Sequence, residues 1–186
     1  MKPITVEQFR RQSAKPKKTR PRLTRREYLD RYLATPPTQA RTEEENAKQR
    51  ALFERHNQVV VSLRLPLAPS IDHYYMAIKL PDRKYASIVK SSEGRAYFEA
   101  VEFFWRRHFE GWPPEPLTGR IRLLVEVHMA RAGKSDVSNR MKALEDALVQ
   151  CGAIVDDSLI DDLRLLRGSI ISQTGAMDVI LEVIEE

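Results

Sequence analysis

The sequence is poor in cysteine and glycine and contains no long apolar run. Cys151 is the single cysteine among 186 residues, which excludes an internal disulfide and a zinc site built from several cysteines. No segment approaches the roughly 20 apolar residues of a membrane-spanning helix, and the first residues lack the apolar core of a signal peptide. We therefore expect a cytoplasmic protein that has no contact with a membrane.

Several motifs of catalytic and nucleotide-binding proteins are also missing. The sequence contains no GxGxxG, GxxxxGK, HExxH or GxSxG pattern, so we expect no nucleotide cofactor and no zinc-protease or serine-hydrolase chemistry. His56 and His128 have no partner at the spacing of a zinc site. The chemistry must therefore come from the charged residues.

Positive charge is concentrated in the N-terminal third of the chain. The whole chain has a net charge of +5. Residues 1–57 hold 15 Lys and Arg against 7 Asp and Glu, a net charge of +8, whereas residues 58–186 have a net charge of −3. This contrast predicts two parts with different roles: a basic N-terminal extension, residues 1–57, and a domain of residues 58–186.

The extension has the pattern of short helices and an extended basic arm. Capping boxes begin at Thr5, Thr24 and Thr42, and we expect helices over 24–33 and 42–56. The extension is either a solvated, partly disordered tail or an arm that contacts DNA phosphates. The candidate phosphate contacts, together with two basic residues of a later loop, are Lys15, Lys17, Lys18, Arg20, Arg22, Arg25, Arg26, Arg131 and Lys134.

From residue 59 onward, strand and helix patterns alternate. β-branched runs and strict alternation indicate strands, and apolar residues at helical spacing indicate helices. A polar loop rich in tyrosine is expected over 70–75. The resulting order, β-α-β-α-β-β, is typical of one α+β domain. The expected strands cover 59–65, 121–129, 163–172 and 177–184, the last two as a hairpin, and the expected helices cover 92–109 and 138–150.

Acidic residues and one lysine surround the second expected helix. Asp136 precedes it, Lys142 lies on its second turn, and Asp156 and Asp157 follow it. Carboxylates that are gathered together repel one another unless a hard divalent cation neutralises them, and Mg²⁺ binds carboxylates together with phosphate oxygens and water. The alternative is structural: Asp136 caps the helix, and Asp156-Asp157-Ser158 forms an acidic turn.

A longer pattern supports the catalytic interpretation. The segments Asp136-Val137-Ser138-Asn139-Arg140-Met141-Lys142, Asp146-Ala147-Leu148, Gly152 and Val155-Asp156-Asp157 resemble the RusA family of Holliday junction resolvases. The resemblance extends over about residues 58–186 and leaves the N-terminal extension outside. It implies a mixed β-sheet packed with two main helices, and a homodimeric, Mg²⁺-dependent endonuclease of DNA recombination and repair that nicks four-way junctions symmetrically.

By position, the resemblance makes Asp136 and Asp157 catalytic metal ligands, with Asp156 beside them and Lys142 as the functional lysine. Mn²⁺ is a possible substitute for Mg²⁺, and Asn139 would support the site. The chain departs from the best-known members at Ser138, where they carry a second aspartate, and a neutral hydroxyl is a poorer ligand for Mg²⁺.

Three functions remain open. The first is a metal-dependent endonuclease that resolves junctions. The second is a non-catalytic protein that binds branched DNA and whose metal site has decayed at Ser138. The third is a nuclease of the same chemistry that prefers flaps or other branched DNA.

Overall fold

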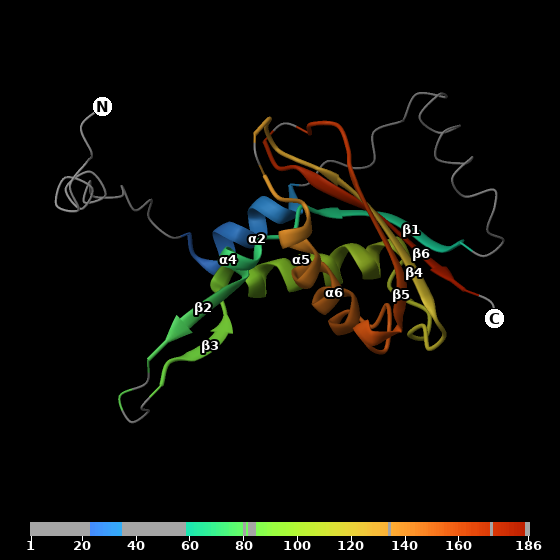
Figure 1. Ribbon diagram of the computed structural model, residues 1–186, viewed down its shortest axis with the longest axis horizontal. Coiled ribbons are helices and arrows are strands. Elements are labelled where there is room, and N and C mark those ends of the chain that lie inside the picture. The colour runs from blue at the N-terminus through green and yellow to red at the C-terminus, as the bar shows by residue number, and fades with distance from the viewer. Residues whose placement is uncertain are drawn as a thin grey trace, which may run out of the picture.

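The computed structural model describes residues 23–34, 59–79, 81, 85–133, 135–171 and 173–184. Within these ranges, helices pack against one face of a four-stranded sheet, and a separate two-stranded ribbon projects from the body (Figure 1). The predicted α+β architecture, a mixed sheet with two main helices, is confirmed.

The sheet has the strand order β1-β6-β4-β5. β6 (Ala176–Val183) lies between β1 (Val59–Pro66) and β4 (Ile121–His128), and it runs antiparallel to both. β5 (Ile160–Arg167) forms the edge and runs parallel to β4. The parallel pair requires a crossover connection, which the helix between β4 and β5 supplies.

The two faces of the sheet differ because side chains alternate along each strand. On one face, Leu123, Val125 and Val127 of β4 and Val179 of β6 are fully buried and join the hydrophobic core beneath the helices. The opposite face carries charged side chains from all four strands: Arg64, Arg122, Glu126, His128, Asp162, Arg164, Asp178 and Glu182.

Two long helices cover the apolar face. α5 (Ser92–His108) begins at Ser91, whose hydroxyl accepts a hydrogen bond from the backbone of Gly94, and its predicted aromatic stripe supplies Tyr97, Phe98 and Trp105 to the core. α6 (Met141–Gln150) follows the 3₁₀ turn η1 (Ser138–Arg140). The helix is followed by Gly152, whose φ of 78° is a conformation that favours glycine.

A short helix from the N-terminal extension packs on α5. α2 (Arg25–Leu33) has the capping box predicted between Thr24 and Glu27. Its Tyr32 is buried, with its ring centroid 5.5 Å from that of Tyr97. Residues 25–33 therefore lie on the body, whereas the helix expected over 42–56 falls outside the described residues, and the division at residue 57 stays a prediction. None of the described helices is long and apolar enough to cross a membrane.

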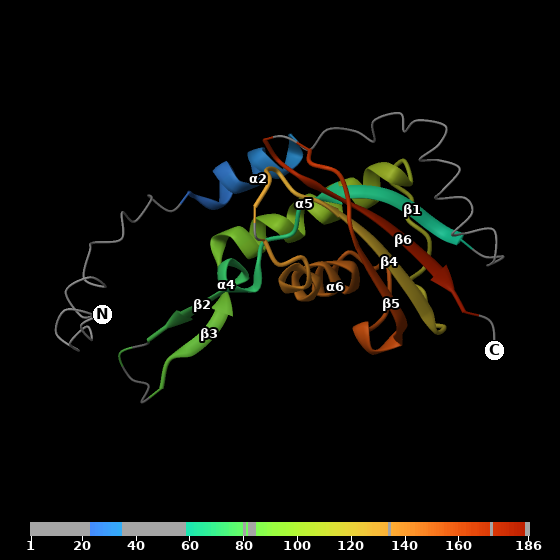
Figure 2. The same ribbon diagram turned by 45° about the horizontal axis from the view of Figure 1, so that its top comes forward.

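The prediction of a loop over residues 70–75 is incomplete. It contains a one-turn helix, α4 (Ile71–Tyr74), and it leads into the antiparallel ribbon of β2 (Tyr75–Ile78) and β3 (Ser87–Lys90). Both views show the ribbon extending away from the sheet and the helices (Figures 1 and 2). Its strands are four residues each, too short for a clear alternating pattern.

The predicted C-terminal hairpin is wrong. β5 and β6 follow each other in the chain, but β4 lies between them in the sheet. Every residue from Ala176 to Glu182 is buried, so β6 has the burial of a central strand. At the edge of the sheet, β6 would have paired along one side only, whereas in the central position it pairs with β1 and with β4.

Candidate active site

Asp136 lies in the turn that leads from β4 into α6. Its Oδ1 accepts hydrogen bonds from the backbone N–H of Ser138 at 2.9 Å and from the Ser138 hydroxyl at 2.7 Å. These bonds, with a further one from the backbone of Asn139 and the nearby charge of Arg167, hold the pKa of Asp136 below its usual value. Asp136 is therefore an ionised, exposed carboxylate at the start of the helix. The capping role named as the alternative is not observed: Val137 precedes η1 and Arg140 precedes α6, and neither helix start has a side-chain capping hydrogen bond. Asp136 instead accepts its hydrogen bonds within the turn.

Lys142 joins the beginning of α6 to the turn that follows the helix. Its ammonium nitrogen Nζ lies 2.6 Å from Asp157 Oδ2 and 2.8 Å from Asp146 Oδ1. The hydrogen bonds to Asp146 and Asp157 raise the pKa of Lys142 well above its usual value, because they stabilise the charged form. The fold thus brings together two residues that are 15 positions apart, a contact that the sequence analysis did not specify.

Asp146 connects this ion pair to the buried core. Its second oxygen, Oδ2, accepts a hydrogen bond of 2.6 Å from the hydroxyl of Tyr74, which is fully buried. Burial and this bond raise the pKa of Tyr74, so the phenol stays protonated. Tyr74 therefore packs in the core, where its ring cannot stack on a DNA base. Burial also raises the pKa of the neighbouring Glu145.

Asp156 and Asp157 lie at the 3₁₀ turn η2 (Asp157–Leu159), which precedes β5. Asp156 Oδ1 accepts a hydrogen bond of 2.9 Å from the backbone of Ser158, and hydrogen bonding by the side chain and then the backbone of Ser158 lowers the pKa of Asp156. Asp156 is exposed, and Asp157 is partly exposed beside Lys142. The structure places Asp156 in the acidic turn named as the alternative and points Asp157 toward the lysine.

Most candidate phosphate contacts fall outside the described residues, and those that are described differ in environment. Arg25 forms an ion pair with Glu99 of α5. Arg26 and Arg131 are exposed to solvent. The candidates outside the described residues are Lys15, Lys17, Lys18, Arg20, Arg22 and Lys134.

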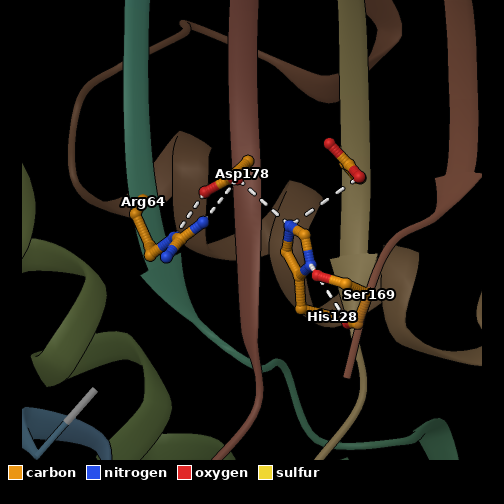
Figure 3. Close-up of polar contacts among 5 residues, drawn as sticks. Arg64, His128, Ser169 and Asp178 are labelled. Atoms are coloured by element: carbon orange, nitrogen blue, oxygen red, sulfur yellow. Dashed lines mark hydrogen bonds and ion pairs between the residues drawn. The ribbon is translucent and has the colours of Figure 1, made fainter. Parts of the chain in front are cut away.

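A second polar cluster lies on the charged face of the sheet. His128 Nε2 is 3.1 Å from Asp178 Oδ2 and 4.0 Å from Glu126 Oε1 (Figure 3). Asp178 also accepts two hydrogen bonds from the guanidinium of Arg64, at 2.6 and 2.7 Å. Within the described part of the chain, Glu126, His128 and Asp178 form a compact group of potential metal ligands, with all ligand atoms within 4.8 Å of one another.

The sequence analysis did not find this second cluster. Alternation along β4 placed Glu126 and His128 on one face, but Asp178 reaches them only because β6 pairs with β4, where Asp178 lies directly opposite Glu126. The wrongly predicted hairpin hid this pairing. Asp136, Asp156 and Asp157 are not members of the group.

Comparison with known proteins gives one match. A family model described as endodeoxyribonuclease RusA matches residues 78–182, more than half of the chain. The matched range includes the turn of Asp136, all of α6 and the turn of Asp157. No curated protein matches the chain.

Proposed function

The chain belongs to the RusA endodeoxyribonuclease family, and we propose that it is a metal-dependent endonuclease that resolves Holliday junctions or related branched DNA by paired symmetric nicks. The observation that carries this proposal is the matched segment itself, in which Lys142 lies beside Asp157 at the end of α6 that also carries Asp136. Lysine and carboxylates arranged in this way suit phosphodiester hydrolysis, which needs negative charge to be neutralised around the reacting phosphate.

The residues present fit a hard divalent cation. Asp136 and Asp156 are exposed carboxylates whose pKa values are lowered, so they are ionised at neutral pH. Oxygen donors of this kind suit Mg²⁺ and Mn²⁺. Asp136 and Asp157 would hold the ion, and Asp156 would contribute from the adjacent position.

Each residue has a distinct task in this proposal. A divalent ion bound here would supply Lewis-acid activation of the attacking water and would stabilise the leaving oxygen. The ammonium group of Lys142 lies against Asp157, so it is placed to offset negative charge on a phosphate bound at that carboxylate. Asp146 and Tyr74 hold this ammonium group in position from the core side.

Ser138 determines how strongly the site binds its ion. Its hydroxyl donates a hydrogen bond to Asp136 Oδ1 and so orients that carboxylate, but it adds no negative charge. We therefore expect weaker Mg²⁺ binding than in a site with a second aspartate, and Asn139 supports the turn through its backbone. If the site has lost its metal altogether, the protein is instead a binder of branched DNA.

Paired nicks require two sites in a two-fold relation. A four-way junction is close to two-fold symmetric, and a C2 homodimer presents two identical sites to it. We propose such a dimer as the active species, with the basic N-terminal extension supplying phosphate contacts that the body, with its net charge of −3, lacks.

The activity test uses a panel of synthetic four-way junctions, flaps and linear duplexes with Mg²⁺ or Mn²⁺. We expect nicking of the junction, with a loss of more than about 100-fold in Asp136→Asn and in Asp157→Asn while junction binding persists, because loss of an outer-sphere partner alone costs about 10–100-fold. Asp161→Asn is the matched control, since Asp161 is an exposed carboxylate on β5 that forms an ion pair with Arg120. Undiminished cutting by both variants would contradict the site assignment.

Two further arms of the experiment separate the alternatives. If the wild-type chain binds junctions without nicking in either metal and Ser138→Asp restores nicking, the metal site has decayed. If flaps are cut faster than junctions, the substrate differs but the chemistry stands.

The basic arm is tested by deleting residues 1–22, which spares α2 and the buried Tyr32. If the arm neutralises about six phosphates, the affinity of the full chain falls roughly 10³-fold between 50 and 200 mM salt, and the truncated chain shows a smaller slope. An unchanged salt slope after the deletion would show that the arm does not contact DNA.

A further inference from the structure

The cluster of Glu126, His128 and Asp178 lies on the face of the sheet opposite α5 and α6. Glu126 and His128 come from β4 and Asp178 from β6, so the cluster joins the two central strands (Figure 3). The His128 and Asp178 side chains are 5% and 9% exposed, and that of Glu126 is 32% exposed. Glu126 therefore leaves the cluster open to solvent on one side.

Three hydrogen-bond acceptors converge in this cluster. His128 Nδ1 lies 3.1 Å from the backbone carbonyl oxygen of Ser169, which only accepts hydrogen bonds, and 3.3 Å from the Ser169 hydroxyl. We assign a proton to Nδ1, which donates it to the carbonyl oxygen. In the neutral imidazole, the lone pair is then on Nε2, which faces the oxygens of Asp178 and Glu126. Ionised carboxylates only accept as well. Either a second proton on the imidazole or a bound metal ion would satisfy the point between these three atoms.

The spacing of the three atoms is that of a metal site. A tetrahedral ion with ligands at about 2.0–2.2 Å sets its ligand atoms roughly 3.3–3.5 Å apart. The two separations from Nε2, 3.1 Å to Asp178 and 4.0 Å to Glu126, lie on either side of this value. Small rotations of the partly exposed Glu126 side chain bring the longer distance into range.

The surroundings of the cluster also match those of bound metals. A metal-binding histidine donates its other N–H to a carbonyl or carboxylate, and metal-binding carboxylates are themselves hydrogen-bonded. Ser169 provides the first contact, and Arg64 provides the second through its two bonds to Asp178. Arg64 balances the charge of Asp178 through these two bonds.

Gly168 closes the cluster on the side of β5. A Cβ atom at this position would lie 2.5 Å from His128 Cε1 and 2.8 Å from Glu126 Oε1, so only glycine leaves the two side chains in place. The backbone at Gly168 is also hydrogen-bonded to Val127 of β4. The segment after β5 thus fixes both the tautomer of the histidine and the space beside it.

We propose that Glu126, His128 and Asp178 form a site for a zinc-class divalent ion, separate from the proposed nuclease site. Imidazole nitrogen selects such ions over Mg²⁺, which prefers oxygen donors alone. The ion joins β4 to β6 at the end of β4, where the chain leaves the sheet toward Asp136. Solvent or a further ligand completes its coordination on the open side of Glu126.

The test is a titration of the full chain, freed of metal by a chelator, with Co²⁺ as a spectroscopic probe and Zn²⁺ as competitor. We expect one equivalent of Co²⁺ with the intense visible absorption of a four-coordinate nitrogen–oxygen site, displaced by Zn²⁺. His128→Gln loses this absorption, Gly168→Ala weakens Co²⁺ affinity about 10-fold or more through the ligands it displaces, and Asp157→Asn retains the absorption.

Two controls keep the result interpretable. His73→Gln makes the same change at an exposed histidine of α4 and leaves Co²⁺ binding unchanged. Glu126→Gln replaces a partly exposed ligand and is used, with circular dichroism as a check on folding, if His128→Gln does not fold. Four-coordinate Co²⁺ absorption that persists in both His128→Gln and Glu126→Gln would overturn the proposal. So would an NMR signal for a proton on His128 Nε2 in the presence of excess Zn²⁺. Neither result bears on nicking, so the nuclease proposal stands or falls separately.

Discussion

Tyr74 and Tyr97 form a matched pair that isolates one hydrogen bond at the candidate active site. Both side chains are fully buried. The hydroxyl of Tyr74 donates to Asp146 at 2.6 Å, whereas the buried hydroxyl of Tyr97 has no hydrogen-bond partner within the described ranges. Replacement by phenylalanine removes the same oxygen atom from each. The two variants therefore differ in the lost hydrogen bond and little else.

The two substitutions are expected to have different effects on the free energy of unfolding. A hydrogen bond to a charged group contributes about 1.5–3 kcal/mol to stability. Asp146 keeps its contact with Lys142 after Tyr74→Phe, so its charge is not left alone, and we expect a loss of about 1.5–2 kcal/mol. Tyr97→Phe removes a buried polar group that has no partner, and we expect its free energy of unfolding to stay the same or to rise.

Urea unfolding followed by tryptophan fluorescence and by circular dichroism measures both changes. For a domain of this size, 1 kcal/mol shifts the melting temperature by roughly 2–4 °C, so Tyr74→Phe should lower it by about 3–8 °C. The slope of free energy against urea should not change, because the surface exposed on unfolding is the same. Equal losses in the two variants would show that the hydroxyl of Tyr74 contributes no more than that of Tyr97, and would refute the reasoning.

Three other predictions concern stability away from this pair. Gly152→Ala should cost about 1–2 kcal/mol, measured by urea unfolding, because φ is 78° and an added Cβ meets no close neighbour. Thr24→Ala should cost about 0.5–2 kcal/mol by the same assay, through loss of the α2 capping box, and Thr24→Ser should retain most of that stability. The pKa of Asp162 is lowered by hydrogen bonds from Arg164 and Arg122, so its contribution is complete at neutral pH and is lost as the pH falls through that lowered value. Asp162→Asn should therefore show a smaller drop in unfolding midpoint between neutral and acidic pH than the wild type.

The sequence predicts the elements whose signals are local. α5 and α6 follow from apolar residues at helical spacing, and α2 follows from the capping box at Thr24. β4 follows from strict alternation. These signals lie within one element, so no knowledge of its neighbours is needed to interpret them.

Strand pairing is a different problem because it depends on distant contacts. β5 and β6 were expected to pair because a turn-like segment, residues 173–176, joins them. In the structure, β5 gains a parallel partner in β4 through the crossover of α6, and β6 pairs along both of its edges, with β1 and with β4. Neither of these strand pairings is indicated by a local sequence pattern. The ribbon of β2 and β3 was missed because its strands are too short to show alternation.

The same distinction applies to the candidate site. The bonds of Asp136 with Ser138 and of Asp156 with Ser158 span two residues. The sequence therefore predicted the acidic turn of Asp156, but its prediction that Asp136 caps the helix is wrong. The contact between Lys142 and Asp157 spans 15 residues: the family pattern singled out both residues but did not predict that they meet. The bond between His128 and Asp178 spans 50 residues and depends on the register of β6, which the sequence analysis had wrong.

Acidic residues of the sheet and those of the proposed nuclease site differ in how their negative charge is balanced. On the sheet, acidic residues are matched by arginines: Asp178 by Arg64, and Asp162 and Glu182 by Arg122. The hydrogen bonds recorded for Asp136 and Asp156 come instead from serine hydroxyl and backbone groups, which orient a carboxylate without cancelling its charge. The carboxylates proposed as metal ligands therefore accept no hydrogen bond from an arginine within the described residues, although the charges of Arg167 and Lys142 help to lower the pKa values of Asp136 and Asp156. A divalent ion bound at these carboxylates would relieve the repulsion between them, as the arginines do for the carboxylates on the sheet. Mg²⁺ should therefore stabilise the wild type against urea more than it stabilises Asp136→Asn.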